Sequence, residues 1–214
     1  MKTKHFIAIG LTCISGAAFS AYSTEPDQKV LTAALNKYLA QQGDFCLGKF
    51  DWPIDVSAPD FEMPTRNAVQ MPVLEKLGLV VSTDVTVARK EDEAEETVPA
   101  KRYALTKAGK KFYQDKKLSS ATSGGVMHHG DFCAGKLSLD KFVRWDASSA
   151  ESGHEEIAVT YTYKFAAAKW TRDPDVQRVF PMVARILNGQ SSMQLQQRFQ
   201  LSGTSWVAVN PWEN

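Results

Sequence analysis

The sequence predicts an α+β protein in which an N-terminal and a C-terminal half are tied together by a disulfide bond. Three observations support this fold class. Runs with helical periodicity end at glycines in both halves, and runs with the alternating pattern of strands follow them. A short motif that contains a cysteine occurs once in each half.

The motif reads GDFCLGK over residues 43–49 and GDFCAGK over residues 130–136, so six of its seven positions are identical. Cys46 and Cys133 are the only cysteines beyond the first twenty residues. Because two cysteines in an oxidising compartment usually pair, we expect a Cys46–Cys133 disulfide. Closing so long a loop restricts the unfolded chain by about 4 to 5 kcal/mol. The alternative is two separately buried thiols, one in each repeated unit.

Residues 1–20 have the layout of a secretory signal peptide, with a basic start, an apolar run and small residues before an expected cleavage after Ser20. The apolar run is shorter than the roughly 20 residues that cross a bilayer. Lipidation of Cys13 is the alternative. We therefore expect a protein of the periplasm or the secreted space, without a membrane span.

The charge balance argues against nucleic acid as a partner. The chain has 25 Lys+Arg and 24 Asp+Glu, and removal of Lys2 and Lys4 with the leader leaves a net charge of about −1. A nearly neutral chain has no field that attracts phosphate or an anionic membrane.

Local patterns predict the elements of the N-terminal half, residues 21–117. Apolar residues at helical spacing predict a helix from Thr24 to Gln42, and alternation predicts an edge strand over 49–56. A second helix over 67–77 ends at Gly78. Strands over 79–87 and 101–105 form a hairpin, and Thr106 caps a last helix that runs to Lys117.

Residues 67–115 resemble a winged-helix domain. The resemblance rests on Leu74-Glu75-Lys76-Leu77-Gly78-Leu79-Val80, a hairpin, and then Tyr103-Ala104-Leu105-Thr106-Lys107-Ala108-Gly109. The family implies DNA binding through the helix before the wing. Here five acids in residues 91–96 occupy the wing tip and would repel phosphate, so the resemblance indicates a scaffold for protein contacts.

Residues 118–129 predict a linker, and residues 130–214 predict an antiparallel sheet with one packed helix. The first strand of this half carries a bulge near Asp140, and the clearest strand spans 157–165. A helix begins at Asp173 and is kinked or split by Pro181. Strands over 193–201 and 206–209 complete the sheet.

Three chemical sites are conceivable. Cys133 or Cys46 is a candidate thiolate nucleophile, with His128, His129 or His154 as base and Asp131 or Asp44 as the group that orients it. His128, His129, Asp131 and Cys133 are candidate metal ligands. Glu155 and Glu156 with Asp173 and Asp175 are candidate paired carboxylates, although a strand start and a helix cap explain them locally.

The preferred interpretation is a non-catalytic protein-binding or envelope-associated module, with an inhibitor or immunity factor as a special case. Its partner is another protein, and no cofactor or metal is expected. Possible binding residues are Lys49 and Lys136, which follow the cysteine in each motif copy, and Trp212 near the C-terminus. The alternative is a cysteine- and histidine-dependent hydrolase or transferase centred on Cys133.

Overall fold

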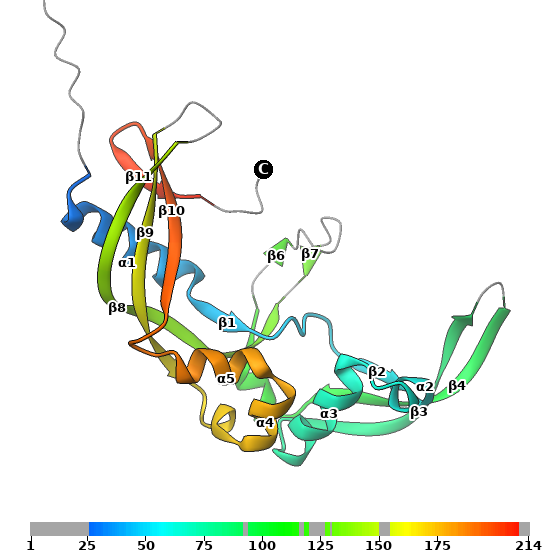
Figure 1. Cartoon of the computed structure of the whole chain (residues 1–214). Coiled ribbons are helices and arrows are strands. Elements are labelled where there is room, and N and C mark those ends of the chain that lie inside the picture. The colour runs from blue at the N-terminus through cyan, green and yellow to red at the C-terminus, as the bar shows by residue number, and fades with distance from the viewer. Residues whose placement is uncertain are drawn as a thin grey trace, which may run out of the picture.

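The structure is a computed structural model that describes residues 26–91, 94–115, 118–119, 127–128, 130–149 and 155–209. Two antiparallel sheets lie at opposite ends of an elongated molecule, and short helices lie between them (Figure 1). The α+β class and the Cys46–Cys133 disulfide are confirmed. The signal peptide, its cleavage site and Cys13 lie outside the described residues.

The larger sheet has the strand order β1-β8-β9-β10-β11, with β5 beside the start of β8. Its strands are β1 (Asp44–Cys46), β5 (Tyr113–Gln114), β8 (Asp131–Ser149), β9 (Glu155–Ala167), β10 (Gln194–Ser202) and β11 (Ser205–Ala208). The expected bulge is present, because the β8–β9 register shifts between Leu139 and Lys141 and again between Phe142 and Arg144.

Helix α1 (Gln28–Gln42) lies across this curled sheet, and it buries Leu31, Leu35 and Leu39. The predicted helix is confirmed over the described residues, and the Asp27 carboxylate caps it by accepting a hydrogen bond from the Lys29 backbone N–H. The segment 21–117 therefore contributes the strand β1 to a sheet that is formed mainly by residues 130–209. The helix α1 of the same segment packs against this sheet.

The helical segment of the C-terminal part is split as predicted. It consists of the 3₁₀ turn η3 (Lys169–Arg172), α4 (Pro174–Val179) and α5 (Pro181–Asn188). Pro181 has no N–H to continue α4, so it becomes the first residue of α5. The Asp173 carboxylate caps α4, as expected from the sequence.

The smaller sheet has the order β2-β4-β3 and consists of β2 (Ile54–Ser57), β3 (Val80–Glu91) and β4 (Ala94–Leu105). Helices α2 (Ala58–Glu62) and α3 (Arg66–Lys76) precede its hairpin. The strand predicted over 49–56 is shorter than expected, because regular pairing starts only at Ile54, after Pro53.

One local prediction needs correction. The helix predicted from Thr106 to Lys117 is wrong, because the chain makes only the 3₁₀ turn η1 (Gly109–Phe112) and then enters β5. Because Tyr113 pairs with Phe132 in β8, the chain is extended at this point and does not continue as a helix. In the segment predicted as a linker, β6 (Leu118–Ser119) and β7 (Met127–His128) pair with each other.

Phe132 lies at the centre of the core that joins the two sheets. Its side chain is 0 % exposed, and its ring lies 5.6 to 6.1 Å from the rings of Trp170, Phe112 and Trp52. These neighbours come from η3, from η1 and from the loop before β2. One ring therefore links three segments that are far apart in the sequence.

We predict that Phe132→Ala lowers the free energy of unfolding by about 3 to 5 kcal/mol, because it leaves a cavity that the surrounding elements cannot close. Urea denaturation followed by tryptophan fluorescence measures this loss. Val207→Ala is the control, since Val207 is exposed on β11. A Phe132→Ala protein as stable as this control would contradict the assigned position of Phe132.

Candidate functional site

The two motif copies lie against each other. Strand β1, which is part of the first copy, runs antiparallel to the start of β8, which is part of the second. Asp44 lies opposite Lys136, Phe45 opposite Gly135, and Cys46 opposite Cys133. The disulfide therefore closes between corresponding positions of the two copies and joins residues 87 positions apart.

The aspartate of each copy faces the glycine-lysine pair of the other. Asp44 Oδ1 lies 3.9 Å from Lys136 Nζ, which also donates to the carbonyl of Ala40 near the end of α1. In the other direction, the Asp131 carboxylate accepts hydrogen bonds from the backbone N–H groups of Gly48 and Lys49, at 3.1 and 2.7 Å. The repeated Asp and Lys thus have reciprocal structural roles.

The Lys49 side chain is only 4 % exposed, which is unusual for a lysine. Its Nζ donates to Asn67 Oδ1 at 2.6 Å, and this contact connects the motif to the first turn of α3. Burial, and then the nearby Arg66, lower the pKa of Lys49 to about 8, although the Asp131 carboxylate acts in the opposite direction.

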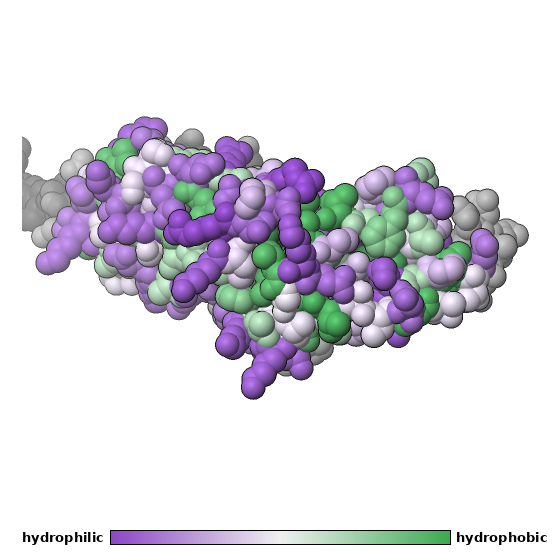
Figure 2. Space-filling view, turned by 90° about the horizontal axis from the view of Figure 1, so that it is seen from below, coloured by the Kyte–Doolittle hydropathy of each residue, from purple (hydrophilic) through white to green (hydrophobic). Residues whose placement is uncertain are grey.

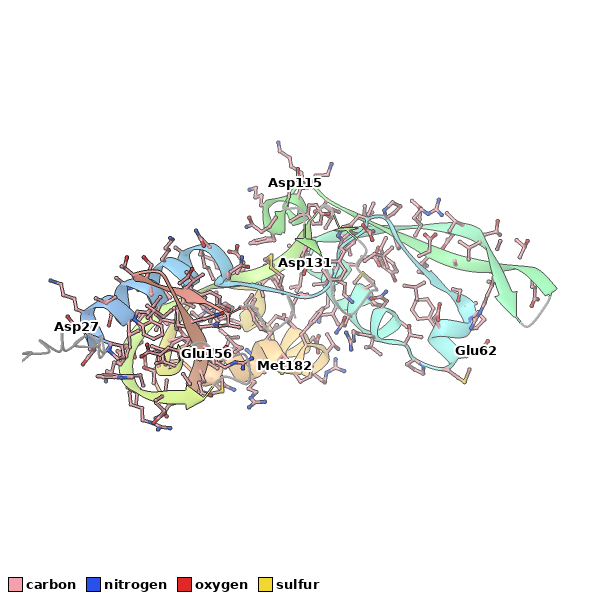
Figure 3. The ribbon with its side chains drawn as sticks, turned by 90° about the horizontal axis from the view of Figure 1, so that it is seen from above. Asp27, Glu62, Asp115, Asp131, Glu156 and Met182 are labelled. Carbon is pink, nitrogen blue, oxygen red and sulfur yellow. A yellow bond between two sulfur atoms is a disulfide. The ribbon has the colours of Figure 1, made fainter. Side chains whose placement is uncertain are left out.

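Asp131 is buried beside this lysine. Burial raises the pKa of Asp131, while hydrogen bonds from the backbone N–H groups of Lys49, Gly48 and Phe132 act in the opposite direction. Figure 3 shows Asp131 in the middle of the molecule, between Glu156 in the larger sheet and Glu62 at the smaller-sheet end. We call Lys49, Asn67, Asp131 and the disulfide the motif joint.

The first glycine of each copy is required by close backbone approach. A Cβ at Gly43 would overlap the carbonyl oxygens of Leu39 and Leu137, and a Cβ at Gly130 would overlap the Gln114 carbonyl oxygen and the Tyr113 ring. Both copies are therefore packed against other strands or helices at the same motif position. This packing accounts for the glycines without any role in ligand binding.

The predicted binding residues have different positions. Lys49 and Lys136 both lie in or beside the motif joint, and the ammonium group of each donates to a protein oxygen. Their role in binding an external group stays a prediction. Trp212 lies outside the described residues.

The candidate nucleophile is not a free thiol here, because the Cys133 sulfur is bonded to Cys46 and Cys133 is 5 % exposed. His129 and His154 lie outside the described residues, and of His128 only the backbone is described. Among the described residues, no three His, Cys, Asp or Glu side chains gather in an arrangement that could hold a metal ion.

The candidate carboxylates have local partners. Asp173 caps α4, and Asp175 accepts hydrogen bonds from Lys76 and Arg178 at 2.8 Å each. The hydrogen bond from Lys76, followed by that from Arg178, lowers the pKa of Asp175 to about 2. Glu156 Oε2 lies 3.7 Å from Arg198 Nη1, at the other end of the C-terminal part.

The structure also has an exposed sheet edge that local sequence patterns do not identify. Strand β8 has 19 residues, but the ladders with β5 and β1 reach only from Asp131 to Lys136. Beyond that point the described ladders pair β8 with β9 alone. We call residues 138–147 the open edge of β8.

Two large apolar residues are exposed on this open edge. Val143 is 41 % exposed and Trp145 is 39 % exposed, and the Trp145 ring makes an edge-to-face contact with Phe142 at 6.0 Å. The underside of the molecule shows a second apolar area, with hydrophobic residues in its middle and mostly hydrophilic residues towards the larger-sheet end (Figure 2).

Comparison with known proteins adds no further identification. No known protein family, curated protein or solved structure matches this chain. Within the described ranges, no helix has both the length and the apolar character to cross a membrane.

We predict that the double variant Cys46→Ala/Cys133→Ala loses about 4 to 5 kcal/mol of unfolding free energy, because its unfolded chain is no longer closed into a loop. Urea denaturation without reductant measures the loss, and reduced wild-type protein should unfold at the same midpoint as the variant. Equal stability of the oxidised wild type and the variant would mean that the bond contributes nothing to the fold.

We also predict a pH dependence from Lys49. Its pKa is lower in the folded protein than in the unfolded chain, so between pH 8 and 10.5 the unfolded chain binds more protons at this position. The contribution of Lys49 to stability should therefore rise across this window, by about 1 to 3 kcal/mol. The rise should appear in the difference between wild type and Lys49→Met, measured by denaturation at each pH.

Lys76→Met is the control for this experiment. The hydrogen bond to Asp175 raises the pKa of Lys76, so its contribution falls only as the pH passes above the ordinary lysine range. A stability difference for Lys49→Met that stays constant from pH 8 to 10.5 would contradict the assigned burial of the ammonium group.

Proposed function

We propose that this protein is a non-catalytic exported protein that binds another protein through the open edge of β8. An exposed strand edge offers backbone N–H and C=O groups that an extended partner segment pairs with. The observation that carries the proposal is the pair of exposed apolar residues, Val143 and Trp145, on an edge that the described strands leave unpaired.

Features of β8 set the kind of partner that fits. Lys141 and Arg144 flank Val143, and the Arg144 guanidinium pairs with Asp146 at 2.7 Å, so charges of both signs lie on the edge. The two register shifts limit the length of regular pairing. A short extended segment with apolar residues at alternate positions therefore matches this edge best.

Export is the second part of the proposal. It rests on the basic and apolar leader in the sequence and on a disulfide in the motif joint, since such bonds persist mainly outside the reducing cytosol. We place the protein in the periplasm or the secreted space, associated with the envelope or acting as an inhibitor or immunity factor.

We further propose that α2, α3 and the β3–β4 hairpin are a winged-helix-like scaffold that serves protein contacts. This part of the proposal rests on the resemblance seen in the sequence and on the order α3, β3 and β4, while the short turn η1 stands where a helix was expected after the wing. Lys76, one of the two cations on α3, forms an ion pair with Asp175 at 2.8 Å, and Arg66 lies near the buried Lys49. The pairing of Lys76 with a carboxylate leaves less positive charge on α3 for phosphate, which supports a protein partner rather than nucleic acid.

The test uses a photocrosslinking amino acid at position 143 in the organism that makes the protein. We expect one discrete crosslinked protein, identified by mass spectrometry, because the open edge accepts a specific strand. The purified partner should then bind the wild-type protein and lose affinity for Val143→Asp, since a carboxylate at this position opposes an apolar partner side chain.

Val81→Asp is the matched control, because Val81 is also exposed and lies on β3, the free edge strand of the smaller sheet. It should bind the partner like wild type. Absence of any crosslinked protein at position 143 would overturn the proposed function, and equal weakening by both variants would overturn the assignment to the β8 edge.

A further inference from the structure

The outer face of the larger sheet carries an arrangement of polar groups with one buried hydroxyl for which the described part of the chain offers no partner. Directly opposed residues in an antiparallel ladder lie on the same face, so Arg144 on β8 and Gln196 on β10 lie on the same face as Thr160 on β9. Tyr161 and Tyr163 point to the other face, where Tyr163 donates to the carbonyl of Ile186 in α5.

We call Thr160, Thr162, Arg144, Gln196, Arg198 and Glu156 the polar strip. Along its centre Thr160 and Thr162 are short and buried, while Arg144, Gln196 and Arg198 on the flanking strands are longer and exposed. A ligand at this face would contact the long side chains along both sides, and it would reach the buried Thr160 hydroxyl only where the groups that cover it move apart.

The Thr160 hydroxyl is the unusual member. Thr160 is 5 % exposed, yet its Oγ1 has no hydrogen-bond partner among the described residues. Its neighbour Thr162, on the same face, donates to Asp140 Oδ2 at 3.1 Å. A buried hydroxyl without a partner is costly to the fold, so its presence in the middle of a polar face indicates that an external group completes it.

The charges on this face are balanced in pairs. Arg198 lies 3.7 Å from Glu156, Lys164 lies 3.8 Å from Asp140, and Arg144 lies 2.7 Å from Asp146. Each paired carboxylate still has lone pairs to accept hydrogen bonds, and each guanidinium still has N–H groups to donate. The face therefore offers many donors and acceptors without a strong net field.

We propose that the polar strip binds a neutral oligosaccharide. Sugar hydroxyls donate and accept at the same atom, which fits alternating amide, hydroxyl and paired charged groups. Beside each cation of the strip lies a carboxylate that would repel a strongly anionic ligand. Beside each carboxylate lies a cation that would repel a strongly cationic ligand. This proposal does not rest on the protein contact proposed at the open edge of β8, although the two surfaces share Arg144.

The test measures amide chemical shifts of the disulfide-bonded protein by NMR during titration with maltotriose, cellotriose and triacetylchitotriose. Trigalacturonate and hexaglycine are the anionic and peptide probes. We expect at least one neutral trisaccharide to shift the amides of residues 158–162. Thr160→Val should lower its affinity about tenfold, because one hydrogen bond to the ligand is lost.

The Thr160→Val protein should melt at the same or a higher temperature than wild type, because the substitution removes a buried hydroxyl that has no partner among the described residues. Thr86→Val, the same substitution at an exposed position of the smaller sheet, is the control and should bind like wild type. The proposal is overturned if no neutral trisaccharide shifts these amides, if Thr160→Val binds as well as wild type, or if trigalacturonate or hexaglycine binds the strip more tightly.

Discussion

The pairing of the two motif copies is the constraint on which the rest of this structure depends. Each copy supplies a strand, a cysteine, an aspartate and a lysine. The strands pair, the cysteines bond to each other, and the aspartate of each copy contacts the lysine of the other. The first copy follows α1 directly, and the second opens β8. Their contact therefore fixes where α1 lies on the larger sheet, and Lys49 extends the same contact to α3 through Asn67.

This joint has an energetic cost that the surrounding core must offset. Lys49 and Asp131 are both buried, and burial opposes the charged form of each. Backbone N–H groups satisfy the carboxylate, and Asn67 accepts from the ammonium group. The aromatic contacts around Phe132 lie immediately beside this polar pair, so apolar packing and polar specificity occur together at the connection between the sheets.

Local sequence patterns were sufficient for elements whose ends are set by their own residues. Gly43 ends α1 and Pro181 splits the C-terminal helical segment, as expected, although Asp27 rather than Thr24 caps the start of α1. The pattern failed at residues 106–117, where a Cβ at Gly109 would meet the Leu79 carbonyl and where Tyr113 pairs with Phe132. These are contacts between distant segments, and the helical periodicity of the sequence gives no information about them.

The candidate sites, too, were predictable only where they do not depend on contacts between distant segments. The cysteine pair was predictable because only two cysteines lie beyond the first twenty residues, whereas the open edge of β8 depends on how far its neighbours extend along it. Alternation identified β9 as a strand with two different faces. The unpartnered Thr160 hydroxyl became visible only with the register of β8 and β10. Both proposed surfaces belong to β8–β10, while the motif joint holds that unit in place.

The measurement that tests this account most directly is peptide mapping of the unreduced protein after alkylation of free thiols. Our account requires one linked pair of peptides, containing Cys46 and Cys133, with neither sulfur alkylated. Recovery of both cysteines in alkylated form, or linked to other chains, would contradict the pairing of the two motif copies and with it the arrangement of the two sheets.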